Sequence, residues 1–376
     1  DLRASKEIIK RENAKDISAA DGLSTAMIDR LFLDDKRIDG MAASLEEIAA
    51  FEDYIGRVEN MRVRPSGIKV GQMRIPIGVV AAIFESRPNV TIDIAALSMK
   101  SGNACILRGG KEAINSNIAL HGIVKSALAS HGLPENIVTL VERTGRELVP
   151  ILLKQNKYID VVIPRGGEGL IRMVTEQSTI PLLKHDKGLC HIYVDASADE
   201  DMSNRIAVNA KVQRPSACNS AETLLIHKNY PHKESLLNAL LEHGVELRGC
   251  AETVSIFPGK ILTAGDADWD TEYLDNILSV KIVDDINQAM SHIAVHGSGH
   301  SDAIITEDYR NSELFLRDVD SAAVFVNAST RFHDGGEFGL GAEVGISTER
   351  LHARGAMGAE GLTTLKYIVY GQGEVR

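Results

Sequence analysis

Short apolar runs that alternate with helix-like stretches constrain the fold of this chain most. Residues 78–84 (GVVAAIF) form one such run, and mostly apolar runs follow at 104–110, 136–141 and 158–164. Apolar residues at helical spacing lie between them. Strands that are apolar on both faces and alternate with helices form parallel sheets covered on both sides. The sequence therefore predicts a Rossmann-type parallel sheet, whose ligands bind beyond the C-terminal ends of the strands.

A second α/β region follows Pro181. Its helices alternate with further apolar runs, so a second parallel sheet is expected. The runs lie at 190–195, 223–226, 280–283, 302–306 and 322–327.

The remaining segments differ in pattern. Residues 1–58 are helical, with breaks expected at Gly22 and Gly40. Residues 61–75 alternate apolar and polar side chains, which is typical of a β-hairpin. We expect the terminal strand 363–371 to pair with this hairpin, within one chain or between two copies.

Composition excludes several classes of function. The net charge of −11 disfavours contact with phosphate backbones, so no nucleic-acid partner is expected. The longest apolar run is far shorter than the roughly 20 residues that span a bilayer. No basic-then-apolar leader opens the sequence, and the four cysteines form no CxxC pair. These features predict a cytoplasmic protein without a membrane partner.

Cys218 is the candidate nucleophile. It lies among small polar residues, after Pro215 and before the apolar run 223–226. A thiol on a loop before a buried strand is held in place and still reachable, and the nearby Lys211 and Arg214 would favour its thiolate. The alternative is a packing role, which is commoner for a free cysteine.

Two glycine turns follow strands of the first region and are candidate cofactor sites. Glycines let a backbone approach a phosphate, and a following helix N-terminus favours an anion. Neither turn has the full GxGxxG pattern, and such turns also simply connect strands to helices. Cations beside the first turn favour NADP over NAD. The residues are Arg108, Gly109, Gly110 and Lys111 in the first turn, and Pro164, Arg165, Gly166 and Gly167 in the second.

Two other polar stretches are candidate ligand sites, and we keep only the first as one. The glycine-rich loop 327–345 carries Ser329, Thr330 and Arg331 and is a candidate anion clamp, unless it is only a connection. Histidines at 292, 296 and 300 are four apart, but glycines interrupt the helix and no cysteine or carboxylate completes a ligand set. We therefore expect no metal.

Together these stretches resemble the gamma-glutamyl phosphate reductase (glutamate-5-semialdehyde dehydrogenase) family of the aldehyde dehydrogenase superfamily. The resemblance extends from about residue 20 to the C-terminus. Residues 283–304 are similar to a family signature, with Met290 where Leu, Ile or Val is usual. The other matching stretches are 84–112, 158–170, 213–225 and 326–355.

The resemblance implies an aldehyde dehydrogenase-like α/β fold with a small β oligomerisation element. It implies an NADP-binding domain of residues 1–60 and 76–189 with part of 345–360, and a catalytic domain of residues 190–344. Residues 61–75 and 361–376 would form the oligomerisation element, so a homodimer or larger homo-oligomer is expected.

The resemblance also implies roles for single residues. Cys218 matches the nucleophile, and Asn89 matches the asparagine that stabilises the oxyanion. Arg108 corresponds to a lysine near the adenine ribose, and Lys111 replaces a glutamate that binds ribose hydroxyls in NAD-preferring members. Gly166 and Gly167 resemble the pyrophosphate turn.

The implied substrate-binding residues have weaker support. Residues 329–331 occupy the loop that holds the amino-acid end of the substrate in relatives acting on glutamate semialdehyde. Arg87, Arg214 and Arg331 are candidates for holding phosphate or the α-carboxylate, from their charge and position alone.

The implied reaction is the NADPH-dependent reduction of L-glutamyl 5-phosphate to L-glutamate 5-semialdehyde and phosphate through a cysteine thioester. This is the second step of proline biosynthesis, and glutamate 5-kinase, which makes the substrate, is an expected partner.

The alternatives are a hydrolytic or coenzyme A-acylating relative, or a silent nucleotide-binding partner of the kinase. The sequence departs from hydrolytic relatives at 183–188, where their general-base glutamate is missing, and the family has a further helix before residue 1.

Overall fold

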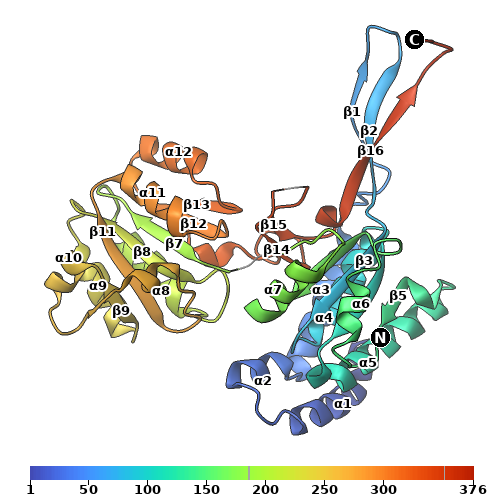
Figure 1. Cartoon of the computed structure of the whole chain (residues 1–376), viewed down its shortest axis with the longest axis horizontal. Helices are drawn as coiled ribbons and strands as arrows, with labels where there is room; N and C mark the ends of the chain where they lie inside the picture. The colour runs from blue at the N-terminus through green and yellow to red at the C-terminus, as the bar shows by residue number, and fades with distance from the viewer. Residues whose placement is uncertain (185–186, 351) are drawn as a thin grey trace. The chain divides into compact units, whose positions relative to one another are not determined.

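The computed structural model describes residues 1–184, 187–350 and 352–376, and it divides into two compact units (Figure 1). The first unit comprises Asp1–Lys184 and Phe338–Arg376, and the second comprises His185–Glu337.

The first unit is built on a parallel sheet with the strand order β5-β4-β3-β6. Alternate residues of β3 enter two separate cores, with Val80 and Phe84 in one and Ala81 and Ile83 in the other. This two-sided burial explains the unbroken apolar run and confirms the predicted fold class. The strands are β3 (Val79–Phe84), β4 (Ala104–Gly109), β5 (Val138–Leu140) and β6 (Val161–Arg165).

Helices pack around this sheet, and further helices precede its first strand in the chain. Gly22 has a φ of 83°, and the Ser24 side chain caps the next helix, so the first expected break is confirmed. The second is wrong, because Gly40 lies inside α3. The helices are α1 (Lys6–Ser18), α2 (Thr25–Leu31), α3 (Asp35–Ala50), α4 (Asn89–Lys100), α5 (Ile114–Ser130), α6 (Leu148–Leu152) and α7 (Glu168–Gln177).

An antiparallel sheet with the order β1-β2-β16 extends away from the parallel sheet of the same unit (Figure 1). β1 (Val58–Val63) and β2 (Lys69–Pro76) form the predicted hairpin, and β16 (Thr363–Tyr370) pairs with β2 within one chain. A short ladder joins β14 (Gly345–Ser347) to β15 (Gly355–Met357).

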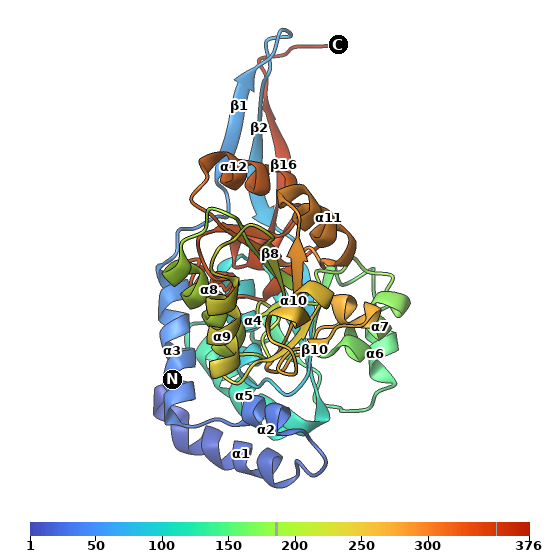
Figure 2. The ribbon, with the colours of Figure 1, turned by 90° about the vertical axis from the view of Figure 1, so that its left-hand side faces the viewer.

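The second unit contains a parallel sheet with the order β10-β9-β11-β8-β7-β12-β13. Helices α8 and α9 run side by side on one face (Figure 2), and α11 and α12 cover the other. The strands are β7 (Cys190–Val194), β8 (Ala221–His227), β9 (Glu246–Gly249), β10 (Leu262–Thr263), β11 (Ile277–Val283), β12 (Ser301–Ile305) and β13 (Ala323–Val326). The helices are α8 (Glu200–Val212), α9 (Lys233–Glu242), α10 (Ala251–Ile256), α11 (Ile286–His296) and α12 (Tyr309–Asp318).

Within the described part of the chain, no helix combines the length and the apolar character needed to cross a bilayer.

Candidate active site

Cys218 lies in a tight turn between α8 and β8. The Ser220 N–H donates to the Ala217 carbonyl at 2.9 Å, so Cys218 and Asn219 form the middle of that turn. Cys218 is partly exposed, whereas Asn219 and Ser220 are buried. The turn therefore presents a reachable thiol on a buried base.

The backbone of Cys218 is packed closely from behind. The Cys190 thiol at the start of β7 donates to the Cys218 carbonyl at 3.3 Å. A Cβ atom placed on Gly188 would lie 1.9 Å from that carbonyl oxygen. Only glycine at position 188 leaves room for the turn in this conformation.

The Cys218 turn is also bonded to the glycine-rich loop. The Asn219 side-chain amide donates to the His333 carbonyl at 2.9 Å, and the Thr330 hydroxyl donates to the Asn219 carbonyl at 2.7 Å. Ser329 caps the short helix η5 (Thr330–Phe332) by accepting from the Arg331 N–H. The structure thus brings the predicted nucleophile together with residues 329–333 of the predicted clamp loop, within the second unit.

Arg331 is the clamp residue whose environment suits an anion. Its Nε donates to the Gln213 side chain at 2.7 Å. Burial and the neighbouring Arg214 guanidinium lower the pKa of Arg331. Two neighbouring cations, one of them partly desolvated, attract a negative charge.

Lys211 has a different environment from the one expected. Its ammonium is buried and pairs with Glu222 at 2.7 Å, while Arg214 is exposed. The charge of Lys211 is therefore matched by a carboxylate instead of being directed to a free thiolate.

Asn89 is the first residue of α4 in the first unit. Its Nδ2 donates to Asp93 Oδ2, one helical turn later, at 2.9 Å. Burial raises the pKa of Asp93 to about 6, and the hydrogen bond from Asn89 opposes that rise. Asp93 thus fixes the orientation of the amide predicted to bind an oxyanion. Arg87 lies just before this helix and is partly buried.

The glycine turns lie at the C-terminal ends of β4 and β6. At the second turn, the Gly167 N–H at the start of α7 donates to the Glu85 carboxylate at 3.0 Å. A Cβ on Gly166 would lie 2.4 Å from the same carboxylate. This helix N-terminus is already shaped to hold an anionic oxygen. Pro164 is buried in β6, and Arg165 forms an ion pair with Glu343 at 3.8 Å.

The two cations of the first turn differ in exposure. Arg108 is buried and donates to the carbonyls of Gly109 and Thr144, each at 3.0 Å. Lys111 is exposed beyond Gly110, at the start of a short helix. Of these two cations, only Lys111 presents its charge to solvent.

The histidines of the signature stretch are packed in the second unit. His292 and His296 share one face of α11, with ring centroids 4.4 Å apart, and only His300 falls outside the helix. The helix ends at His296 with Gly297 after it, so the three histidines do not share one helical face, as the glycines predicted. Burial lowers the pKa of His292 to about 3. Among the residues that the structure describes, no three His, Cys, Asp or Glu side chains group as metal ligands.

The Glu272 carboxylate accepts the Gly188 N–H at 2.9 Å. The sequence analysis gave no role to four residues that support the candidate site: Asp93, Gly188, Glu222 and Glu272. The sequence does point to Asp93, because side chains four residues apart on a helix are neighbours and Asp93 follows Asn89 by four residues on a predicted helix. It also points to Glu222, because a charged residue beside an apolar run needs a partner when it is buried. Within 183–188, positions 185 and 186 lie outside the described residues.

Comparison with known proteins gives consistent results. The model of the aldehyde dehydrogenase family matches residues 3–249. Gamma-glutamyl phosphate reductases from Nautilia profundicola and Moorella thermoacetica are each 52% identical over 379 residues, covering 100% of this chain and 92% and 90% of theirs. The solved structure of gamma-glutamyl phosphate reductase from Thermotoga maritima has a TM-score of 0.95 at 44% identity, covering 100% of this chain and 91% of that one.

Proposed function

Because the chain belongs to the gamma-glutamyl phosphate reductase family of the aldehyde dehydrogenase superfamily, we propose that it reduces L-glutamyl 5-phosphate to L-glutamate 5-semialdehyde and phosphate with NADPH. The observation that carries this proposal is the reachable Cys218 thiol on a rigid turn bonded to an arginine-bearing loop. In this proposal the first unit binds the dinucleotide and the second supplies the nucleophile.

The first step is acyl transfer to Cys218. The thiolate attacks the acyl carbon, the carbon–sulfur bond forms, and the bond to the phosphate oxygen breaks as phosphate leaves. Asn89 and the Cys218 backbone N–H stabilise the oxyanion, each contributing on the order of 3 kcal/mol in comparable sites. Collapse of the later thiohemiacetal releases the aldehyde and restores the thiol.

The glycine turns fit a dinucleotide. The Gly167 N–H already bonds a carboxylate, so it is oriented toward an anionic oxygen such as those of a pyrophosphate. At the other turn the Asn117 and Glu112 side chains lie where a Cβ on Gly109 or Gly110 would be, so both positions require glycine. The exposed Lys111 is the cation available to a 2′-phosphate. When bound, NADPH supplies the hydride for reduction of the thioester.

The proposal includes the partners of the reaction. The reduction is the second step of proline biosynthesis in the cytoplasm, and association with glutamate 5-kinase would pass on a labile acyl phosphate. The antiparallel sheet exposes Val63, Tyr367 and Val369, which supports a homo-oligomer formed through this element.

Replacing Arg331 with alanine should raise KM for glutamate 5-semialdehyde about tenfold or more, the value of one charge-assisted hydrogen bond. KM for NADP⁺ should change little, because Arg331 lies in the second unit. Steady-state kinetics with each substrate varied in turn provide the measurement. Arg205→Ala is the control, since Arg205 is exposed on α8 of the same unit. Equal effects on both KM values would remove the anion-binding role.

The decisive experiment measures NADP⁺ reduction by glutamate 5-semialdehyde with and without inorganic phosphate. Turnover that requires phosphate would identify acyl-phosphate chemistry. Turnover without phosphate but with water or coenzyme A as the acceptor would assign the chain to the hydrolytic or acylating alternative. A protein that binds NADP⁺ and turns over under none of these conditions would support the silent nucleotide-binding alternative.

A further inference from the structure

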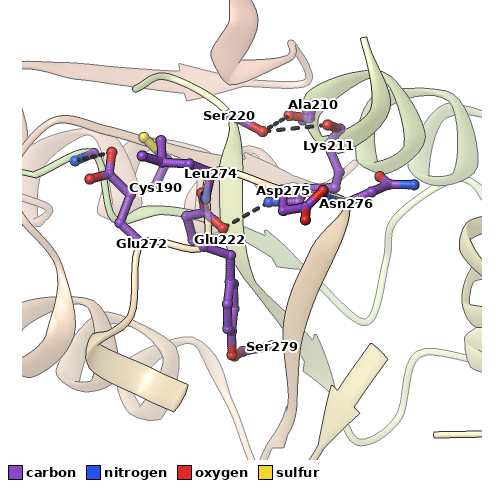
Figure 3. Close-up of polar contacts among 12 residues, drawn as sticks. Cys190, Ala210, Lys211, Ser220, Glu222, Glu272, Leu274, Asp275, Asn276 and Ser279 are labelled. Atoms are coloured by element: carbon purple, nitrogen blue, oxygen red, sulfur yellow. Dashed lines mark hydrogen bonds and ion pairs between the residues drawn. The ribbon is translucent and has the colours of Figure 1, made fainter. Parts of the chain in front are cut away.

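A buried ion pair connects the two elements that flank the Cys218 turn. Lys211 lies in the last turn of α8, and Glu222 is the second residue of β8. Their Nζ and Oε2 atoms are 2.7 Å apart, and both side chains are at most 1% exposed. Figure 3 shows the two residues reaching toward each other from the helix and the strand. The segment that carries the nucleophile thus begins and ends at this pair.

Ser220 holds the same segment to the same helical turn. Its hydroxyl donates to the carbonyls of Ala210 and Lys211, at 3.1 and 3.4 Å (Figure 3). Lys211 therefore contacts the far end of the segment twice, through its backbone carbonyl and through its ammonium. A shift of Lys211 would be transmitted to both ends of the turn.

Glu222 also connects to the backbone behind Cys218. Its Oε1 accepts the N–H of Leu274, whose φ of 53° is rare for a residue with a side chain. Two residues earlier, Glu272 accepts the Gly188 N–H at 2.9 Å. Gly188 is the residue packed against the Cys218 carbonyl. The segment from Glu272 to Leu274 therefore joins the ion pair to the support of the nucleophile.

Desolvation limits what this ion pair contributes to stability. Burial lowers the pKa of Lys211 and raises that of Glu222 to about 7, so desolvation opposes both charges. An apolar pair of similar volume is often as stabilising as a buried ion pair. What an apolar pair lacks is direction, because only hydrogen-bonded charges fix the separation and rotation of two elements.

We propose that Lys211 and Glu222 are positioning residues for Cys218. Their ion pair fixes the spacing of α8 and β8, and thereby the orientation of the Cys218 thiol and its backbone N–H. The inference rests on the proposed function only in taking Cys218 as the nucleophile.

The test is the double variant Lys211→Met/Glu222→Gln, which removes both charges together. It should still fold, because no unpaired charge is left buried. Its kcat should fall about 10- to 100-fold, the usual cost of a small misplacement, with KM for NADP⁺ unchanged. The rate at which iodoacetamide alkylates Cys218 can be followed by mass spectrometry from about pH 6 to about pH 10. The pH dependence of this rate should differ between the double variant and the wild type.

The matched control is Lys228→Met/Asp284→Asn, which removes an exposed ion pair of the same unit and should change neither readout. A folded double variant with wild-type kcat and alkylation would overturn the proposal. If the double variant does not fold, Glu222→Asp gives the same test, because it keeps the charge and shortens the side chain. Wild-type behaviour of Glu222→Asp would then overturn it. Alkylation of Cys218 needs no substrate. It therefore tests the positioning role even if the protein does not catalyse the proposed reaction.

Discussion

Cys218→Ser is expected to lower phosphate-dependent NADP⁺ reduction by at least about 10⁴-fold, the scale on which removal of a nucleophile acts. Serine retains the size and the turn but offers a hydroxyl with no base bonded to it in the described contacts. The variant should still bind NADPH, because the glycine turns lie in the first unit. Steady-state rates and NADPH fluorescence titration measure the two effects separately.

Cys250→Ser is the matched control for this prediction. Cys250 is also a partly exposed free thiol of the second unit, and it contacts the Thr253 hydroxyl at 3.2 Å, a contact that serine can keep. It should retain wild-type rates. A Cys218→Ser enzyme within about tenfold of wild type would remove the thioester from the mechanism.

The parallel sheets were predictable because their signal is local and repeated. Each residue of β3 enters one core or the other, which leaves an apolar run that no exposed strand would show. The helix α12 was not predicted, since it buries Phe315 and leaves most other positions accessible. Gly40 was misleading because a helix held by packing tolerates one glycine.

The candidate residues of the site have local signals in the sequence, and the residues that support them do not. Cys218 and the glycine turns are recognisable from neighbouring residues in the sequence. The contacts that fix Cys218 join residues far apart, such as Gly188 with Glu272 and Asn219 with His333. A single sequence carries no local signal for such pairs.

Gly188→Ala is expected to reduce kcat by about 10²-fold or more, because the turn must move away from its present position. The new Cβ would lie 1.9 Å from the Cys218 carbonyl oxygen and 2.7 Å from its Cα. Both are backbone atoms, so no side-chain rotation relieves the overlap. Overpacking of this kind also costs about 1–3 kcal/mol of unfolding free energy. Kinetics and denaturant unfolding of the purified variant measure the two effects.

Gly122→Ala separates this overlap from a general effect of replacing glycine. Gly122 lies in α5, and beyond the backbone of that helix no described atom comes within 4 Å of the place that a new methyl group would take. Alanine there should leave kcat unchanged and stabilise the helix by about 0.5–1 kcal/mol. Glutamate semialdehyde oxidation by Gly188→Ala at the wild-type rate would show that the Cys218 turn tolerates displacement. That result would argue against rigid support of Cys218 as a requirement for catalysis, because the overlap must shift the backbone of residue 188, of Cys218 or of both.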